Sequence, residues 1–272
     1  MLVFPKAKIN LGLNIIERRS DGFHDIETLF YPVSLFDALE VVQGAGGQNS
    51  DILTITGTHV PGETDQNIVL KAAEKIRHEF GIPHLKIHLH KNIPVGAGLG
   101  GGSSDGAFML KTLNRLFGLG LSCDDLKPIA AGLGSDSPFF IDCLPAFASG
   151  RGEILKPSAE ILDGFHGVLI NPGIEVKTKD AYAGCIPSVP AERLEALLLR
   201  PVEEWKDTIV NDFERTIFPV YPEIRDIKET LYDCGALYSS MSGSGSTVYG
   251  IFRNKPVLPD YVMKDVIFNG LF

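Results

Sequence analysis

The 272-residue sequence has no apolar run approaching the roughly 18 residues that a membrane-crossing helix needs. Its first residues, Met1 to Lys6, lack the apolar core of a secretory signal peptide. Its four cysteines include no Cys-x-x-Cys pair, which argues against a zinc site and is typical of a reducing compartment. We therefore expect a cytoplasmic protein without a membrane partner.

Positive charge is also in short supply. The chain has 25 Lys and Arg residues against 34 Asp and Glu residues, so its formal net charge is −9. This balance argues against a general nucleic-acid binder, which needs basic surface for phosphates. It does not exclude nucleotides, because single loops of an acidic protein can attract anions. The length is comfortable for two packed domains, and we place their division at residue 155, giving domains 1–155 and 156–272.

Glycine, by contrast, is concentrated in one segment. Six of the eleven residues from Gly96 to Gly106 are glycine, and a helical pattern follows directly. Glycine is costly in regular secondary structure, so such a cluster indicates that the backbone must come close to something. The usual ligand is phosphate, held by backbone N–H groups at a helix N-terminus.

Two common phosphate motifs do not fit this segment well. A P-loop requires Lys after its last glycine, and no lysine follows here. The spacing Gly96-x-Gly98-x-x-Gly101 matches the dinucleotide fingerprint of an NAD-binding dehydrogenase, but residues 92–94 separate it from the preceding strand. That dehydrogenase and a plain flexible linker remain the alternatives from local sequence.

Hydrophobic periodicity predicts strands and helices mixed along the whole chain. Between residues 6 and 16, apolar and polar side chains alternate, which indicates a half-buried strand that pairs as a hairpin with a strand at 23–33. The fold class is therefore α+β, with mixed sheets and helices packed on them. The other expected strands are 53–56, 85–90, 167–170, 236–241 and 247–252, and the expected helices are 67–80, 103–117, 122–134, 191–199 and 221–232.

The segment from Pro94 to Ser104 resembles the phosphate-binding motif of the GHMP kinase superfamily. Within that superfamily, further segments resemble the kinases that act on 4-diphosphocytidyl-2-C-methyl-D-erythritol in the non-mevalonate route to isoprenoids. These segments are Lys8–Leu11, Asp21–His24, Glu27–Phe30, Gly134–Phe140, Asn211–Glu214 and Met241–Ser246. The resemblance covers essentially the whole chain and implies a two-domain GHMP kinase fold with the active site in the cleft between the domains.

The resemblance also assigns the catalytic pair. Asp136 lies in a Gly-Ser-Asp-Ser-Pro turn, where local sequence alone favours a helix cap or an Asx-turn. Lys8 lies on the polar face of a strand, where a lysine is usually solvated. The family's catalytic aspartate and its partner lysine fall on these two positions. Lys8 is then expected to stabilise the ionised Asp136 and the transferred phosphoryl group.

For the nucleotide, the resemblance implies ATP with Mg²⁺, and the sequence names no protein ligand for the metal. Asn67 matches a position near adenine, although an asparagine before a helix is also a common N-cap. The residues expected to bind ATP are Pro94, Val95, Gly96, Ala97, Gly98, Leu99, Gly100, Gly101, Gly102, Ser103, Ser104, Asn67 and Lys91.

For the second substrate, cytosine recognition requires stacking and hydrogen bonds to the edge of the base. The residues that the resemblance implies for this substrate are Asn10, Phe23, His24, Phe30, Thr178 and Tyr182. Two departures from the family stand out: Phe23 replaces a common Tyr, and Gly106 is expected to weaken the start of its helix. The remaining expectations are a monomer or weak homodimer and, as the alternative activity, a homoserine or mevalonate type of kinase.

Overall fold

The computed structural model describes residues 1–272 and divides the chain into two compact units. Neither unit is one continuous segment. Unit 1 consists of Met1–Ala7, Leu35–Val95 and Gly100–Leu144, and unit 2 consists of Lys8–Ser34, Gly96–Leu99 and Pro145–Phe272. The division predicted at residue 155 separates two consecutive segments, whereas these units interleave along the chain. The glycine-rich segment contributes residues to both.

Unit 1 contains a four-stranded sheet in the order β1-β4-β6-β5. Its strands are β1 (Leu2–Val3), β4 (Ala38–Gln43), β5 (Ile52–Gly57) and β6 (Leu85–Lys91). β6 pairs antiparallel with β4 and parallel with β5. Along β6, Leu85, Ile87 and Leu89 are buried, while Lys86, His88 and His90 are exposed. This pattern confirms the strand predicted from alternation.

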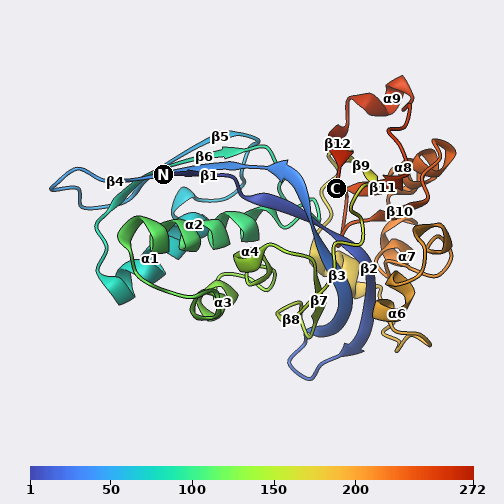
Figure 1. Ribbon diagram of the computed structural model, residues 1–272, viewed down its shortest axis with the longest axis horizontal. Helices are drawn as coiled ribbons and strands as arrows, with labels where there is room; N and C mark the ends of the chain where they lie inside the picture. Colours follow the sequence, from blue (N-terminus) through green and yellow to red (C-terminus); the bar gives the residue numbers. More distant parts are fainter. The chain divides into compact units, whose positions relative to one another are not determined.

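Helices cover one side of this sheet (Figure 1). They are α1 (Ile68–Phe80), α2 (Gly101–Phe117), α3 (Cys123–Ala131) and α4 (Phe139–Asp142), with a short 3-10 turn at Thr64–Gln66. α1 packs on α2, and α3 and α4 also contact α2. Asn67 caps α1 by accepting a hydrogen bond from the Val69 N–H at 3.0 Å, and Gly81 ends it with φ of +66°. The capping box predicted from Ser122 opens α3.

Unit 2 contains most of a second sheet, in the order β2-β3-β7-β8, and a third, in the order β10-β11-β9-β12. The second sheet is formed by β2 (Lys6–Arg18), β3 (His24–Phe36), β7 (Ala146–Ser149) and β8 (Ile154–Pro157). The third is formed by β9 (His166–Ile170), β10 (Tyr238–Met241), β11 (Val248–Phe252) and β12 (Val266–Leu271). The predicted pairing of β2 with β3 is confirmed, and so are the strands predicted at β10 and β11.

The helices of unit 2 are short except for α8 (Pro222–Asp233), which packs on β10 and β11. The others are α5 (Thr178–Ala183), α6 (Leu194–Leu198), α7 (Glu214–Ile217) and α9 (Asp260–Met263), with a 3-10 turn at Val202–Glu204. A single apolar cluster joins β2, β9 and α8, through side chains such as Leu13, Ile170 and Ile224. Within unit 2, this cluster packs β2, the strand that carries Lys8 and Asn10, against β9 and α8.

Two expectations about elements need correction. Five strands were not predicted: β1, β4, β7, β8 and β12. Each has only two to six residues, which leaves little room for a recognisable alternation. The helix expected from 103 begins at Gly101. Gly106 has a packing reason: a Cβ atom there would lie 2.8 Å from Ile68 Cγ1 of α1. Its absence of a side chain allows α1 and α2 to approach each other.

Candidate active site

The glycine-rich segment leads into the N-terminus of α2. Gly96, Gly98 and Gly100 have φ values of +67°, +78° and +69°, a conformation that side chains other than glycine rarely adopt. Gly100 is the N-cap of α2, and no side chain caps the helix there. The first N–H groups of a helix have no partners within it. The loop therefore presents uncapped backbone donors at the positive end of a 17-residue helix.

The glycines of this loop are required for different reasons. A Cβ atom on Gly98 would lie 1.9 Å from the Ser242 carbonyl oxygen, so the fold itself demands glycine there. Gly102 is helical and exposed, and a Cβ atom would meet nothing within 4 Å. A glycine costs about 1 kcal/mol relative to alanine inside a helix. The packing of the protein therefore does not explain why this position is glycine.

Lys8 of β2 is buried beside this loop, in unit 2. Its ammonium group donates to Asn10 Oδ1 at 2.5 Å and to the Gly98 carbonyl at 3.2 Å. It lies 4.9 Å from the centre of the Phe30 ring, close enough for a cation–π contact. The Lys8 N–H also donates to the Leu99 carbonyl at 2.9 Å. Lys8 and the loop thus form one hydrogen-bonded assembly, and Phe30, which is buried, forms the wall beneath the cation.

A second glycine-rich loop, Ser242 to Ser246, contacts the first. Ser242 Oγ donates to the Gly98 carbonyl at 2.8 Å and accepts from the Asn10 N–H at 3.2 Å. Asn10 Nδ2 in turn donates to Thr28 Oγ1 at 3.1 Å. Farther along the second loop, the hydroxyl groups of Ser244 and Thr178 lie 3.2 Å apart. The structure therefore brings the predicted residues Lys8, Asn10 and Thr178 to the two glycine loops.

The aromatic residues predicted to bind the cytosine base lie in different environments. The rings of His24 and Tyr182 stack with centroids 4.8 Å apart and planes 15° apart, and Tyr182 also packs edge-on against Phe213. Partial burial and, secondarily, the nearby Arg18 charge lower the pKa of His24, which favours the neutral imidazole. Phe23 is exposed, with the Arg151 guanidinium 4.9 Å from its ring centre. His24 and Tyr182 thus form a platform, and Phe23 lies outside it.

Asp136 lies in unit 1, half-exposed in the turn between α3 and α4. The turn is closed by the Ser137 N–H, which donates to the Gly134 carbonyl at 3.1 Å. A Cβ atom on Gly134 would lie 3.3 Å from Ser137 Oγ and 3.4 Å from Ser103 Oγ. The turn that carries Asp136 therefore packs directly against the first turn of α2. Within unit 1, the predicted carboxylate and the predicted phosphate-binding helix terminus are neighbours.

Lys91, predicted to contact the nucleotide, lies in a buried ion cluster. Its ammonium group donates to Asp37 and, at 2.6 Å, to Asp105, and all three side chains are almost fully buried. Asp37 also accepts the backbone N–H groups of residues 92 and 93 at 2.6 Å and 2.9 Å. Burial, with the Asp37 charge adding to it, raises the pKa of Asp105 to about 8 although Lys91 opposes the shift. This cluster ties the end of β6 to the first turns of α2.

Asp37 and Asp105 were not predicted from the sequence as members of this cluster. Asp37 lies in no recognisable local motif, and Asp105 follows directly after the two serines of the glycine-rich segment. Because Asp37 and Asp105 both accept from the Lys91 ammonium group, these contacts support a structural role for Lys91 at the start of α2. A direct contact between Lys91 and the nucleotide stays a prediction.

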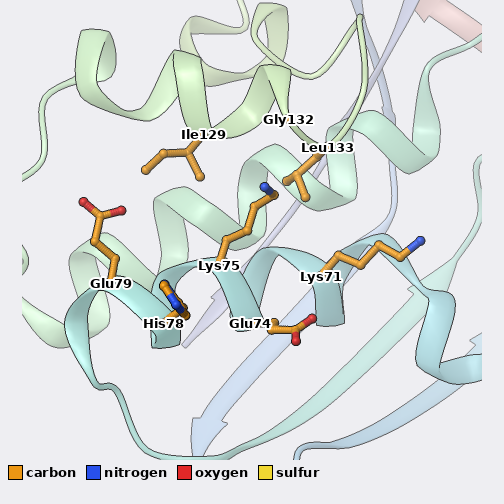
Figure 2. A pocket seen from close by; sticks show the side chains of 8 residues that line it. All are labelled: Lys71, Glu74, Lys75, His78, Glu79, Ile129, Gly132 and Leu133. Atoms are coloured by element: carbon orange, nitrogen blue, oxygen red, sulfur yellow. The ribbon is translucent and has the colours of Figure 1, made fainter.

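A hollow of unit 1 lies elsewhere, on the surface formed by α1 and the end of α3 (Figure 2). Its volume is about 880 Å³, and it is lined by Lys71, Glu74, Lys75, His78, Glu79, Ile129, Gly132 and Leu133. None of the residues predicted for catalysis or binding lines it. Lysine and glutamate side chains alternate along this part of α1, so the hollow carries no strong charge of one sign.

No group of three or more His, Cys, Asp or Glu side chains is arranged to hold a metal ion, and all four cysteines are free. A Mg²⁺ ion usually reaches such a site with a nucleotide, bound by phosphate oxygens, water and at most one or two carboxylates. The absence of a protein cage is compatible with that mode. None of the helices combines the length and the apolar composition needed to cross a membrane.

Comparison with known proteins decides the family. Residues 67–145 match the family model of the GHMP kinases N terminal domain, and residues 194–258 match that of the GHMP kinases C terminal domain. The chain is 48% identical over 252 residues to the 4-diphosphocytidyl-2-C-methyl-D-erythritol kinase of Bacteroides fragilis, covering 93% of this chain and 92% of the relative. The chain belongs to the 4-diphosphocytidyl-2-C-methyl-D-erythritol kinase family of GHMP kinases.

Two further members of this family extend the match. The 4-diphosphocytidyl-2-C-methyl-D-erythritol kinase of Parabacteroides distasonis is 45% identical over 272 residues, covering 100% of this chain and 97% of the relative. A crystal structure of 4-(cytidine 5'-diphospho)-2C-methyl-D-erythritol kinase superimposes with a TM-score of 0.78 at 35% identity, covering 92% of this chain and 90% of that one. These findings confirm the kinase class and the GHMP kinase fold expected from the sequence.

Proposed function

We propose that this protein transfers the γ-phosphoryl group of ATP to the 2-hydroxyl of 4-diphosphocytidyl-2-C-methyl-D-erythritol, the kinase step of the non-mevalonate isoprenoid pathway. The observation that carries the proposal is the 48% identity over nearly the whole chain to a relative named for that substrate. The relatives compared at 45–48% identity are named for this substrate, and none of them is named as a homoserine kinase or a mevalonate kinase. The uncapped glycine loop at the N-terminus of α2 supports ATP as the donor.

In this proposal the phosphates of ATP lie over the first turn of α2, against the backbone from Pro94 to Ser104. The open space above Gly102 admits a phosphate oxygen to the helix N–H groups. A Mg²⁺ ion bound with these phosphates would supply neutralising positive charge there, and no side chain of the protein is assigned as its ligand. Asn67, which already caps α1, presents the rest of its amide near the adenine.

The chemical step requires a group that accepts or orients the proton of the acceptor hydroxyl, and a cation for the transferred phosphoryl group. Asp136 supplies the carboxylate, because it is half-exposed beside the α2 terminus. Lys8 supplies the cation, held in place by Asn10 and the Gly98 carbonyl. Little covalent chemistry is asked of the protein, so the value of both residues depends on how rigidly they are held.

The cytidine end of the substrate binds at the His24–Tyr182 platform. A neutral His24 ring can donate and accept hydrogen bonds at the edge of cytosine, and Tyr182 offers a face for stacking. Thr178 and Asn10 complete the polar contacts. We further propose that the protein acts in the cytoplasm as a monomer or weak homodimer and has no membrane or nucleic-acid partner.

The test is a coupled assay of ADP release from purified protein with ATP, Mg²⁺ and the cytidine-linked substrate. ADP release that depends on this substrate, and not on homoserine or mevalonate, is the expected result. If well-folded protein releases no ADP with the cytidine-linked substrate, the assignment is wrong.

The role of Asp136 has its own test. Asp136→Asn keeps the shape of the side chain but removes its ability to accept a proton, so turnover is expected to fall about 100-fold or more. The KM for ATP should change little. A variant with near-normal turnover contradicts the catalytic role of Asp136 and leaves the substrate assignment standing.

A further inference from the structure

The segment Asn211-Asp212-Phe213-Glu214 has no role in the function described so far, yet its polar side chains are buried. It lies between β2 and the second glycine loop, all within unit 2. Its backbone forms a short parallel bridge to β2, in which the Asp212 N–H donates to the Leu13 carbonyl at 2.8 Å. The Asp212 carboxylate also accepts the Ile15 N–H at 2.8 Å. This end of the segment is therefore fixed to the strand that carries Lys8.

Asn211 uses its side chain on the second glycine loop. Its amide nitrogen donates to the Met241 carbonyl at 2.7 Å and to the Gly243 carbonyl at 2.8 Å, the two carbonyls that flank Ser242. Its amide oxygen accepts the Phe213 N–H at 3.0 Å. Glu214 adds to this hold, because its carboxylate accepts the Met241 N–H at 2.8 Å and pairs with Lys228 at 2.6 Å. The backbone on both sides of Ser242 is thus held by buried side chains.

Ser242 connects these hydrogen bonds of Asn211 and Glu214 to the candidate site. Its hydroxyl group donates to the Gly98 carbonyl, which also accepts from Lys8. The two backbones are so close that a methyl group on Gly98 would meet the Ser242 carbonyl at 1.9 Å. A displacement of Ser242 would therefore move Gly98 and weaken the attachment of Lys8.

We infer that Asn211 is a positioning residue for the nucleotide loop: it holds Ser242, and Ser242 with Lys8 fixes Gly98. This inference rests on the proposed function, because it assigns the glycine loop to ATP. Asn211 acts through Ser242 and touches no substrate. It suits the role because only a side-chain amide can donate two hydrogen bonds to two carbonyls and accept a third in so small a volume.

The perturbation is Asn211→Asp, which is nearly isosteric but directs an acceptor at two carbonyl oxygens. We expect the KM for ATP to rise at least tenfold. Ser242→Ala, which removes the hydroxyl that holds Gly98, should raise it to a similar extent. If both act through the same contact, the double variant should be close to the worse single variant, since the effects of coupled residues are not additive. Asn211→Ser, which keeps one donor, serves if the Asp variant does not fold.

The control is Ile227→Ala, which opens a cavity in the core of unit 2 and lowers stability without touching either loop. It should leave the KM for ATP within about twofold of wild type. The inference is overturned if the Asn211 and Ser242 effects multiply, or if the Asn211 variant behaves like the control. If the wild-type protein itself does not phosphorylate the cytidine-linked substrate, the proposed function has failed instead. In that case direct ATP titration by calorimetry of the wild type, the two single variants, the double variant and the control still tests the positioning of the loop.

Discussion

Replacing Gly102 by alanine separates the needs of the fold from the needs of the ligand. Gly102 is an exposed residue in the first turn of α2, and an added methyl group meets no protein atom within 4 Å. Alanine is more favourable than glycine in a helix by up to about 1 kcal/mol. The free energy of unfolding should therefore stay constant or rise by that amount, which corresponds to a gain of about 2 °C in Tm.

The same methyl group should weaken ATP binding. It occupies the space through which we propose that a phosphate oxygen approaches the N–H groups of α2. Losing one charge-assisted hydrogen bond costs about 1.5–3 kcal/mol, or roughly a ten- to hundredfold increase in the Kd for ATP. Thermal unfolding and isothermal titration with ATP and Mg²⁺ measure the two effects on the same sample.

Gly106→Ala, one turn farther along α2, is the matched control. Its methyl group would lie 2.8 Å from Ile68 Cγ1, and such overpacking costs about 1–3 kcal/mol against the same gain in helix propensity. This variant should be less stable than wild type while its affinity for ATP is largely preserved. The opposite signs of the two stability changes identify the cause. An alanine at Gly102 that leaves the ATP affinity unchanged would refute the assignment of phosphate to this turn.

Two further predictions concern the buried cluster and the aromatic platform. Because the pKa of Asp105 is raised to about 8 in the folded protein and lies near 3.9 in the unfolded chain, the folded state retains a proton that the unfolded state loses. The contribution of this group to the free energy of unfolding therefore falls as pH rises from about 4 to 8, by at most roughly 1.4 kcal/mol per pH unit. In denaturant unfolding, the stability of Asp105→Asn relative to wild type should increase with pH across that window. Parallel pH profiles of the two proteins would contradict the shift. Tyr182→Ala removes the ring stacked on His24, so the KM for the cytidine-linked substrate should rise about tenfold with that for ATP unchanged, whereas an equal rise in both would place the platform elsewhere.

Local pattern was enough to predict most of the elements. The alternation along β2 predicted a strand with Lys8 and Asn10 on one face, and the glycine cluster correctly preceded a helix. The expectation of a half-buried strand was wrong, because residues 7–15 are buried on both faces and the polar side chains of Lys8 and Asn10 hydrogen-bond within the protein. What local pattern could not predict is which distant residue each polar group meets. Ser242 reaches Gly98 and Asn10 across 144 and 232 residues, and no periodicity encodes such pairs.

The interleaved units explain the other differences. Residues 8–34 join the C-terminal half of the chain because β2 and β3 share an apolar cluster with β9 and α8. A division into consecutive segments cannot represent this arrangement. Lys91 was predicted from resemblance as a ligand-binding residue, yet its partners Asp37 and Asp105 come from positions with no local signal. Buried ion clusters depend on desolvation, which only the folded structure defines.

The polar side chains around the glycine loops compensate for the flexibility of the glycines. In a protein of net charge −9 that binds polyphosphates, as we propose for this one, backbone N–H groups and a helix terminus attract anions without additional cationic side chains. Backbone N–H groups can bind a ligand only if the loop keeps one conformation, and glycine has little preference for any single backbone conformation. The surrounding polar side chains restore the lost rigidity: Asn211 and Ser242 hold the loop at Gly98, and Lys91 with its carboxylates holds the start of α2. The energetic cost of the glycines is thus met by buried hydrogen bonds that lie far apart in the sequence.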